Sequence, residues 1–383
     1  MLRVAYVLPT LLRPSGWRTY AVALLRSIQE YVEPMIFASA ADAEEARSLF
    51  PQKQVYVLPV TQSAALTSLR GQLALLRCYR AISSNAIPKV DLVHSLEAYP
   101  TGLVGSWLSR RLGCPHALTA HGTYGVVWHD LFLDRLAYRR VLRHASLVLS
   151  VSQGTETMLR RYFGSDLAGA RLRVILNGND FTKRVPQQQA LERSWPEVPT
   201  MLSVGDIKPR KGQHHSLAAF ALVKKDLPQA RYWIVGKYQN NEYYLNMQRY
   251  VAENDLKDVS FLGTVSDDEL DRLYRLASLF VLTPQQEGLS FEGFGLVYLE
   301  AGAYGLPVVA TRSGGVADAV KDGHTGLLVE PGDVEGIAAA LLRLLTNPDL
   351  LRRMGRENRL WAESLTWERN AAEHYQAYQE VCQ

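Results

Sequence analysis

Short apolar runs alternate with longer amphipathic segments along the whole chain. Helices are expected between these runs, for example at 20–29 and 267–277. The second of these follows Ser266 and starts with three acidic residues, a pattern typical of a helix N-terminus. Strands are expected at 4–8, 35–37, 55–58, 92–94, 117–119, 147–149, 174–176, 201–204, 232–235, 259–262, 280–282 and 308–310. Continuous apolar strands separated by helices predict parallel sheets with helices on both faces.

The length predicts two domains. A chain of 383 residues exceeds the usual single domain of about 100–200 residues. Residues 183–199 have the weakest pattern, with three prolines and three consecutive glutamines, and are interpreted as a linker. We therefore expect an N-terminal domain over 1–182, a C-terminal domain over 200–365, and a last helix over 366–383 whose aromatic side chains need a surface, such as that of the N-terminal domain.

Composition narrows the class of protein. The chain is 47% apolar, which excludes general disorder, and no run approaches the ~18–20 apolar residues of a membrane span. Its three scattered cysteines argue against a disulfide framework or a structural zinc site. The N-terminus alternates like a strand and lacks the features of a signal peptide. We expect a soluble, cytoplasmic protein.

The two halves differ in charge. Residues 1–185 hold 22 basic and 12 acidic side chains, whereas residues 186–383 hold 20 and 26. A basic half attracts anions such as phosphate-bearing substrates or anionic lipid, although a solvated surface explains the charge equally well. Nucleic acid is not an expected partner, because the basic residues are spread over many helices and are not interleaved with exposed aromatics in one module.

Two leucine-rich stretches with arginines, 66–80 and 131–143, have an amphipathic pattern. One interpretation is peripheral docking at the inner face of an anionic membrane, which would bring a lipid-linked acceptor to the protein. The favoured interpretation is that these are ordinary helices packing their leucines on the sheet.

The strongest chemical signal is the segment 291–301, Phe-Glu-Gly-Phe-Gly-Leu-Val-Tyr-Leu-Glu-Ala. It follows a strand and opens a helix, where free backbone N–H groups suit a phosphate. Gly293 and Gly295 let the backbone approach a ligand closely. Glu300 lies eight residues after Glu292, which we interpret as about two turns into that helix, and its carboxylate suits hydrogen bonds from sugar hydroxyls.

A second signal is the loop 205–212, Gly-Asp-Ile-Lys-Pro-Arg-Lys-Gly, at the end of a strand. Its three cations suit a pyrophosphate. His121 also follows a strand, and so does His94. We interpret His94 as a structural residue, because no motif surrounds it. Two facing sheets with a deep cleft between them would suit transfer of a group between two substrates.

These motifs together resemble the large retaining glycosyltransferase family called group 1 or family 4, which has the two-domain GT-B fold. The family's Glu–seven residues–Glu motif corresponds to Glu292 and Glu300, and its phosphate loop to 205–212. Further matches are the glycine turn at Ser15-Gly16-Trp17, His121 at a strand end, Val174 to Asp180, and Ser313-Gly314-Gly315.

The resemblance implies roles for individual residues. Glu300 would bind the ribose of the nucleotide, and Lys211 would neutralise the pyrophosphate. His121 would lie beside the transferred sugar, and Gly16 would let the first loop approach the donor phosphate. The donor sugar would be held by Glu292 and the backbone of Gly293, Phe294 and Gly295. The chain departs from the family at Asp206, where an arginine is usual; Arg210 or Lys208 is the candidate to replace it.

The function implied is transfer of a sugar from a nucleotide-diphosphate donor to a glycan, lipid-linked or small-molecule acceptor, with retention of configuration. No cofactor is expected. The chain has no Asp-x-Asp motif of the metal-dependent transferases, and Arg210, Lys211 and the helix end can serve in place of a metal. Two alternatives remain, a nucleotide-sugar epimerase on the same fold and a non-catalytic nucleotide-sugar-binding protein. The basic half weakly favours a phosphate-bearing or membrane-linked acceptor.

Overall fold

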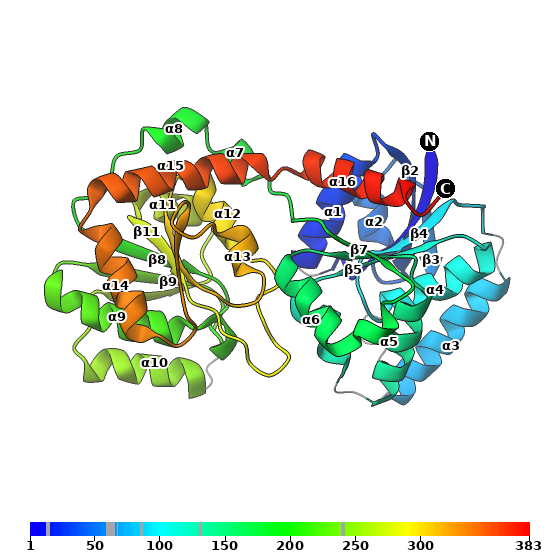
Figure 1. Ribbon diagram of the computed structural model, residues 1–383, viewed down its shortest axis with the longest axis horizontal. Coiled ribbons are helices and arrows are strands. Elements are labelled where there is room, and N and C mark those ends of the chain that lie inside the picture. Colours follow the sequence, from blue (N-terminus) through cyan, green and yellow to red (C-terminus); the bar gives the residue numbers. More distant parts are fainter. Residues whose placement is uncertain (13–15, 59–65, 67, 85–86, 130–131, 239–241) are drawn as a thin grey trace. The chain divides into compact units, whose positions relative to one another are not determined.

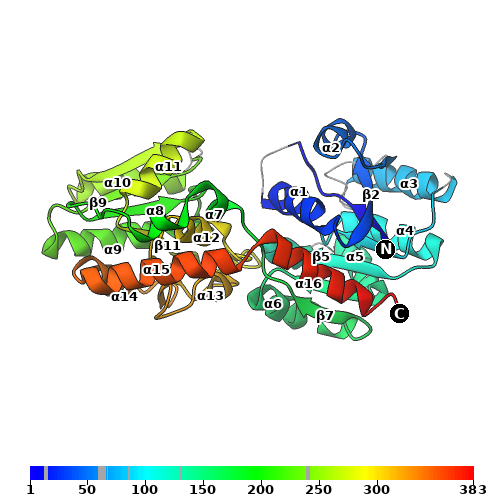
Figure 2. The ribbon, with the colours of Figure 1, turned by 90° about the horizontal axis from the view of Figure 1, so that it is seen from above.

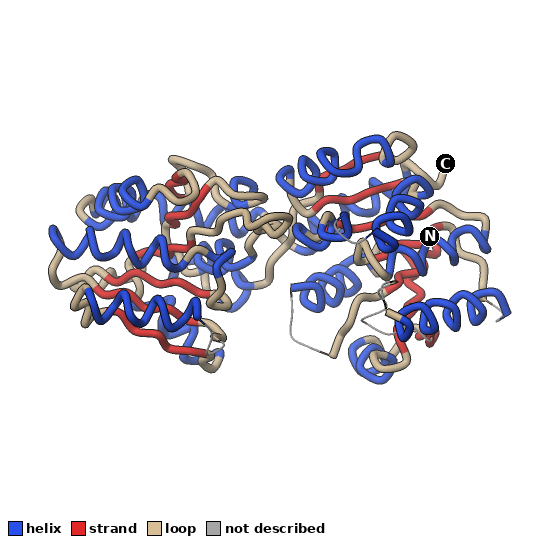
Figure 3. The backbone as a smooth tube through the Cα atoms, turned by 90° about the horizontal axis from the view of Figure 1, so that it is seen from below, coloured by secondary structure: helices blue, strands red, loops and turns tan. Residues whose placement is uncertain are grey.

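The computed structural model describes the chain except for residues 13–15, 59–65, 67, 85–86, 130–131 and 239–241. It divides into two compact units: unit 1 is Met1–Gly178 with Trp367–Gln383, and unit 2 is Asn179–Thr366. In each unit a sheet lies between helices (Figures 1 and 3). All strand pairs are parallel. The predicted α/β class with two doubly wound domains is confirmed.

Unit 1 has a sheet of order β3-β2-β1-β4-β5-β6-β7. Its strands are β1 (Leu2–Val7), β2 (Val32–Ser39), β3 (Val55–Leu58), β4 (Leu92–Ser95), β5 (His116–Ala120), β6 (Leu147–Ser150) and β7 (Arg171–Val174). Its helices are α1 (Gly16–Ile28), α2 (Ala43–Leu49), α3 (Leu69–Ser84), α4 (Thr101–Leu112), α5 (Phe132–His144), α6 (Gln153–Phe163) and α16 (Trp367–Gln379). The central strands β1 and β4 are almost wholly buried.

The C-terminal helix α16 lies alongside α1 (Figure 2). Its Trp367 and Tyr378 are buried in the apolar core of unit 1. A buried polar network adds to this packing. The hydroxyl of Tyr378 lies 2.7 Å from Nδ1 of His94, and the hydroxyl of Tyr20 lies 2.8 Å from Nε2 of His374. His94 is therefore a hydrogen-bonded core residue, as its lack of a surrounding motif indicated.

Four histidines of unit 1 have pKa values below that of a free histidine. Burial lowers the pKa of His116 to about 3 and those of His121 and His374 to about 4, and it holds the pKa of His94 well below its ordinary value. An unfolded histidine titrates near 6.5, so the unfolded chain binds more protons as the pH falls below 6.5. Burial raises the pKa of Glu97 to about 7, which partly offsets this effect.

We therefore expect the free energy of unfolding of unit 1 to fall between pH 7 and pH 5, by at most about 1.4 kcal/mol per pH unit for each buried histidine. Hydrogen exchange measured segment by segment as a function of pH checks this. Exchange in β4, β5 and α16 should accelerate first, and His374→Gln should make the pH dependence shallower. A flat profile in these segments would contradict it.

Unit 2 has a sheet of order β10-β9-β8-β11-β12-β13. Its strands are β8 (Thr200–Val204), β9 (Arg231–Val235), β10 (Val259–Gly263), β11 (Leu279–Leu282), β12 (Val308–Thr311) and β13 (Gly326–Val329). Its helices are α7 (Phe181–Arg184), α8 (Gln187–Leu191), α9 (Gln213–Asp226), α10 (Glu242–Glu253), α11 (Asp267–Leu276), α12 (Leu296–Ala303), α13 (Val316–Ala319), α14 (Val334–Leu345) and α15 (Pro348–Ser364). Ser266 caps α11 by accepting a hydrogen bond from the N–H of Glu269, as its position predicted.

The segment 183–199, interpreted from the sequence as a linker, belongs to unit 2 in the structure. The reason is a set of contacts with distant parts of the chain. Arg193 donates hydrogen bonds to the carbonyl oxygens of Tyr304, Arg275 and Ala277 at 2.6–3.1 Å, and its guanidinium lies over the ring of Trp195. Helix α8 packs against α15. The chain passes between the units at Gly178–Asn179 and at Thr366–Trp367.

Candidate active site

The cationic loop of unit 2 lies at the carboxyl end of β8. Residues Pro209–Lys211 form a single 3₁₀ turn, and Gly212 ends it with a φ of 69°. A Cβ atom at Gly212 would lie 1.8 Å from the carbonyl oxygen of Thr283, and the Thr283 hydroxyl donates a 2.8 Å hydrogen bond to the Gly212 carbonyl. Only glycine fits at this position, because any side chain would clash with Thr283. The contact holds the backbone next to Lys211 in place.

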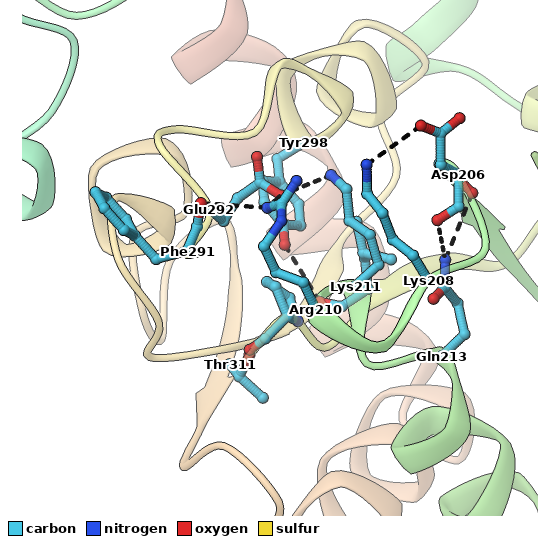
Figure 4. Close-up of polar contacts among 12 residues, drawn as sticks. Asp206, Lys208, Arg210, Lys211, Gln213, Phe291, Glu292, Tyr298 and Thr311 are labelled. Carbon is cyan, nitrogen blue, oxygen red and sulfur yellow. Dashed lines mark hydrogen bonds and ion pairs between the residues drawn. The ribbon is translucent and has the colours of Figure 1, made fainter. Parts of the chain in front are cut away.

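Lys211 and Arg210 meet the carboxylate of Glu292 (Figure 4). Oε2 of Glu292 accepts hydrogen bonds from Nζ of Lys211 at 2.6 Å and from Nη1 of Arg210 at 3.0 Å. All three side chains are largely buried. Burial alone would raise the pKa of Glu292, but the two cations hold it below its ordinary value. The site is therefore an ionised cluster with one more positive than negative charge, and this balance suits an anionic ligand.

The glycines of the Ser313-Gly314-Gly315 motif contact the backbone of Glu292. The N–H of Gly315 donates a 2.8 Å hydrogen bond to the Glu292 carbonyl, and a Cβ atom at Gly314 would lie 2.2 Å from the same oxygen. Gly314 has a φ of 56°, which glycine adopts without strain. The backbone at Glu292 is thus held by residues that follow it by more than twenty positions in the sequence.

Helix α12 begins later than the sequence suggested. It starts at Leu296 after Gly295, whose φ is 90°, so Glu300 is its fifth residue and lies about one turn in, not two. Glu292, Gly293 and Phe294 form the preceding loop, and the buried ring of Phe294 anchors it. Burial raises the pKa of Glu300 to about 7, while the neighbouring Tyr274 hydroxyl acts in the opposite direction.

Asp206 lies away from the Glu292 cluster. Its carboxylate pairs with Nζ of Lys208 at 3.3 Å, and both side chains are exposed (Figure 4). Of the two cations proposed to replace the family's usual arginine, Arg210 reaches the cluster, whereas Lys208 pairs with Asp206.

One contributor was not anticipated from the sequence. Gln285, just after β11, accepts a hydrogen bond from His215 at its Oε1 atom, donates through its Nε2 to the Pro209 carbonyl at 3.3 Å, and donates through its backbone N–H to the Arg210 carbonyl at 2.9 Å. These hydrogen bonds connect the 3₁₀ turn at Pro209–Lys211 to the segment that follows β11. The signal that could have marked it is a polar residue three positions after a buried strand.

The remaining predicted site residues, His121 and Gly16, lie in unit 1. His121 follows β5 and donates a hydrogen bond from Nε2 to the Leu96 carbonyl at 2.9 Å, which leaves Nδ1 without the proton in the neutral ring. Its ring packs edge-on against Tyr20. Gly16 is the exposed first residue of α1, with open space where a Cβ would be. The preceding Ser15 of the glycine turn lies outside the described residues.

The structure thus brings Arg210, Lys211 and Glu292 into direct contact in unit 2. Glu300 lies one helical turn beyond the loop of Gly293, Phe294 and Gly295. Among the described residues, no helix combines the length and apolar character needed to cross a bilayer.

Comparison with known proteins identifies the family. The model of Glycosyltransferase Family 4 matches residues 14–183, and that of Glycosyl transferases group 1 matches residues 188–361. The GDP-mannose-dependent alpha-(1-6)-phosphatidylinositol monomannoside mannosyltransferase of Mycolicibacterium smegmatis is 32% identical over 273 residues, 69% of this chain and 70% of that protein. The corresponding monoacylated-substrate mannosyltransferase of Corynebacterium glutamicum is 27% identical over 341 residues, 87% of this chain and 86% of that protein.

The fold agrees with this assignment. The crystal structure of Anabaena HepE in complex with UDP and glucose covers 100% of both chains with a TM-score of 0.72 at 20% identity. The chain belongs to the group 1, family 4 glycosyltransferases and has their GT-B fold. It is therefore a glycosyltransferase.

Proposed function

We propose that this protein transfers a hexosyl group from a nucleotide-diphosphate sugar to an acceptor hydroxyl, with retention of anomeric configuration and without a metal ion or other cofactor. The observation that carries the proposal is the contact of Lys211 and Arg210 with Glu292 at the end of β8. Two cations that converge on one buried carboxylate offer the charge that a leaving diphosphate needs.

The ionised cluster suggests how the donor is held. In the structure, Oε2 of Glu292 accepts hydrogen bonds from both cations. A diphosphate competes with this carboxylate for Lys211 and Arg210, because it is also an anion with several acceptor oxygens. Glu292 is then able to accept hydrogen bonds from hydroxyls of the donor sugar. Glu300, one turn into α12, takes the ribose hydroxyls.

The chemical step follows from the same charges. The bond between the anomeric carbon and the diphosphate oxygen breaks, and the electron pair leaves with the diphosphate. Lys211 and Arg210 stabilise that developing charge. The acceptor oxygen bonds to the anomeric carbon on the face that the diphosphate leaves, and its proton passes to a departing phosphate oxygen. This sequence needs no protein nucleophile and retains the configuration.

One transfer experiment separates the proposal from its alternatives. GDP-mannose is the first donor to test, because the mannosyltransferase relatives depend on it by name, and UDP-glucose is the second. With EDTA present, proton NMR should show an α-linked product from the α-linked donor. An epimerase would instead alter the donor sugar with no acceptor present, and a binding protein would leave both substrates unchanged. A β-linked product or a strict requirement for a divalent metal would contradict the proposal.

Donor affinity should depend on pH through Glu300. Its pKa of about 7 means that the carboxylate is partly protonated at neutral pH, and binding two ribose hydroxyls favours the ionised form. The dissociation constant for GDP-mannose should therefore rise towards tenfold per pH unit as the pH falls below 7. Titration calorimetry between pH 5.5 and pH 8 measures this. Glu300→Gln should bind more weakly and without that pH dependence, and an unchanged profile in this variant would exclude the role.

Two helices of unit 1 support a second proposal, contact with an anionic membrane. The leucines of α3 that the sequence interpretation placed against the sheet face outward instead: Leu69, Leu73 and Leu76 are 77%, 54% and 45% exposed. The buried positions of α3 fall on the opposite side, at Leu75 and Cys78. The sequence did not indicate which side of α3 is buried, because both sides of the helix carry apolar residues.

Helix α5 likewise has exposed apolar side chains on one side and buried ones on another. Phe132 and Leu133 are exposed, while Tyr138 and Val141 are buried, and residue 131 lies outside the described part of the chain. Both helices pack against α4. Arginines at 70 and 77 in α3 and at 140 in α5 are also exposed, and the Arg135 guanidinium lies over the ring of Phe132. Exposed apolar residues with neighbouring cations are typical of surfaces that bind anionic bilayers.

Vesicle flotation tests the membrane contact. The protein should float with vesicles that contain phosphatidylglycerol and much less with pure phosphatidylcholine, and salt should weaken the binding. Leu69→Ser combined with Leu73→Ser should reduce flotation several-fold. The control is Leu360→Ser, a leucine of unit 2 that is 48% exposed. Equal flotation of all three proteins, or none with anionic lipid, would contradict this contact.

A further inference from the structure

Unit 2 contains a recess at the edge of its sheet where the strands begin, opposite the edge that carries Lys211 and Glu292. Its walls come from the segment 185–195, which leads into β8, from the end of α11 and the turn after α12, which lead into β11 and β12, and from α15. Two hollows of about 320 Å³ and 550 Å³ form it, and both are lined by Ala190 and residues 192–194. Pockets for small ligands usually have about 300–1,000 Å³.

Arginines determine the charge of the recess. Four of them line it: Arg193, Arg275, Arg352 and Arg356. Glu192 is the one acidic side chain among the described residues that line it, and it accepts a 3.1 Å hydrogen bond from Gln188. Arg275 already has a counter-ion, because it donates hydrogen bonds of 2.6 Å and 2.9 Å to Asp271.

The other three arginines have no close acid partner. Arg352 comes only within 3.8 Å of Asp349, whose side chain is 99% exposed. In the part of the chain that the structure describes, Arg193 and Arg356 form no ion pair. Three cations therefore face one carboxylate, which leaves an excess of two positive charges. A phosphate ester carries about 1.5–2 negative charges at neutral pH, so it matches this excess better than a single carboxylate does.

Arg193 is a half-buried cation that lacks a full counter-charge. Its terminal nitrogens donate to the carbonyl oxygens of Tyr304, Arg275 and Ala277, while its buried Nε has no hydrogen-bond partner. These carbonyls lie at the ends of α11 and α12, where they supply only partial negative charges. Burial and the nearby charge of Arg275 lower the pKa of Arg193 to about 10. An anion in the recess would supply the charge that the protein does not.

Helix α15 holds Arg352 and Arg356 on a face that packs tightly against the rest of the recess. Gly355 lies on the same face, and a Cβ atom there would be 2.2 Å from the Gly305 carbonyl oxygen and 3.4 Å from the ring of Trp195. The helix can come this close only because position 355 is a glycine. Side chains four positions apart on a helix have Cβ atoms about 5–6 Å apart, so both arginines can reach one phosphate group.

We propose that this recess binds a small phosphate ester, with Arg352 and Arg356 donating hydrogen bonds to its phosphate oxygens. The planar guanidinium group suits phosphate oxygens, which it can bind in pairs. The exposed Ser194 lines both hollows and offers a further donor. This inference does not rest on the proposed transferase function, because the recess lies at the other edge of the sheet from the donor cluster.

The test measures binding of phosphates to the full-length protein by titration calorimetry. Arg210 and Lys211 would also attract phosphate, so the starting protein carries Arg210→Ala and Lys211→Ala, which remove that cluster. This protein should bind inorganic phosphate and glucose 1-phosphate at one site, and it should not bind glucose. Adding Arg352→Ala and Arg356→Ala should weaken the binding of both phosphates at least tenfold, as loss of charged hydrogen bonds does.

Two further variants provide the controls. Arg343→Ala with Arg353→Ala removes the same charge from exposed arginines of α14 and α15 that do not line the recess, and it should change the affinity less than twofold. Ser194→Glu keeps every arginine of the recess and adds an acid to an exposed position of its wall. It should weaken phosphate binding at least tenfold without changing the midpoint of denaturant unfolding, which guards against a folding defect.

The outcomes separate this proposal from the proposed function. A starting protein that binds neither phosphate would overturn the assignment of the recess, as would binding that survives the substitutions at 352, 356 and 194. Equal weakening by the control pair, or glucose binding as tight as that of its phosphate, would also overturn it. Equal affinity for the two phosphates supports a site for the phosphate group alone, and tighter binding of the ester supports a contact with its ring. If the wild-type protein transfers no sugar but the recess binds phosphate, this proposal stands and the transferase proposal fails.

Discussion

Replacing Lys211 with alanine should lower kcat/KM for sugar transfer by roughly 100- to 1000-fold, the usual effect of removing one group that stabilises a developing oxyanion. Nζ of Lys211 lies 2.6 Å from Glu292, so the substitution removes the shorter of the two cation contacts. The loss should appear mainly in kcat, because charge on the diphosphate develops fully only as the bond to the sugar breaks. Steady-state kinetics with the donor found in the transfer assay measures both parameters.

Lys208 supplies the matched control for that experiment. It lies in the same loop, but it is exposed and pairs with Asp206. Lys208→Ala should leave kcat within about twofold of wild type, since exposed ion pairs contribute little. Similar losses in both variants would mean that the loop acts only through its overall charge. Near wild-type activity of Lys211→Ala would show that this lysine does not stabilise the leaving group.

The second large effect is expected at Gly314. Its added Cβ would lie 2.2 Å from the Glu292 carbonyl oxygen and 2.7 Å from the Phe291 ring, at a φ of 56°. Gly314→Ala must therefore move the backbone that carries Glu292. We expect it to destabilise unit 2 by about 3 kcal/mol or more and to lower activity by at least tenfold, since strain at one backbone position alone costs of order 1–3 kcal/mol. Denaturant unfolding and kinetics provide the two measurements.

Gly323→Ala separates the clash from the backbone strain. Gly323 also has a positive φ, 75°, but nothing lies within 4 Å of its added Cβ. This variant should lose about 1 kcal/mol of stability and keep its activity. Equal losses of stability at both glycines would show that the contact with Glu292 is not what requires glycine at 314.

The sequence predicted strands well where apolar runs are continuous and poorly where they are short. β1 and β8 were expected within two residues of their observed bounds. β13, with three apolar residues after Gly326 at the edge of its sheet, was not expected. The segment 183–199 resembled a linker because its sequence is rich in proline and glutamine. The contacts of Arg193 with carbonyl oxygens more than 80 positions away are invisible in local patterns.

In the candidate site, too, local motifs predicted individual residues but not the contacts between distant parts of the chain. Glu292, Lys211 and Arg210 were each marked by a local motif, but their pairing joins residues 81 and 82 positions apart. Local patterns also placed the start of α12 too early, because the positive φ of Gly295 cannot be distinguished in the sequence from ordinary helix entry.

The most direct test of the account compares a nucleoside diphosphate with its sugar in wild type and in Glu292→Gln. Glu292 pairs with Lys211 and Arg210 in the structure, and we propose that it accepts hydrogen bonds from the donor sugar once a diphosphate takes these two cations. Calorimetry with GDP and GDP-mannose, and with UDP and UDP-glucose in parallel, should show that Glu292→Gln binds the diphosphate at least as tightly as wild type and the nucleotide sugar about tenfold more weakly. Equal weakening of both ligands, or no change in either, would contradict the central claim.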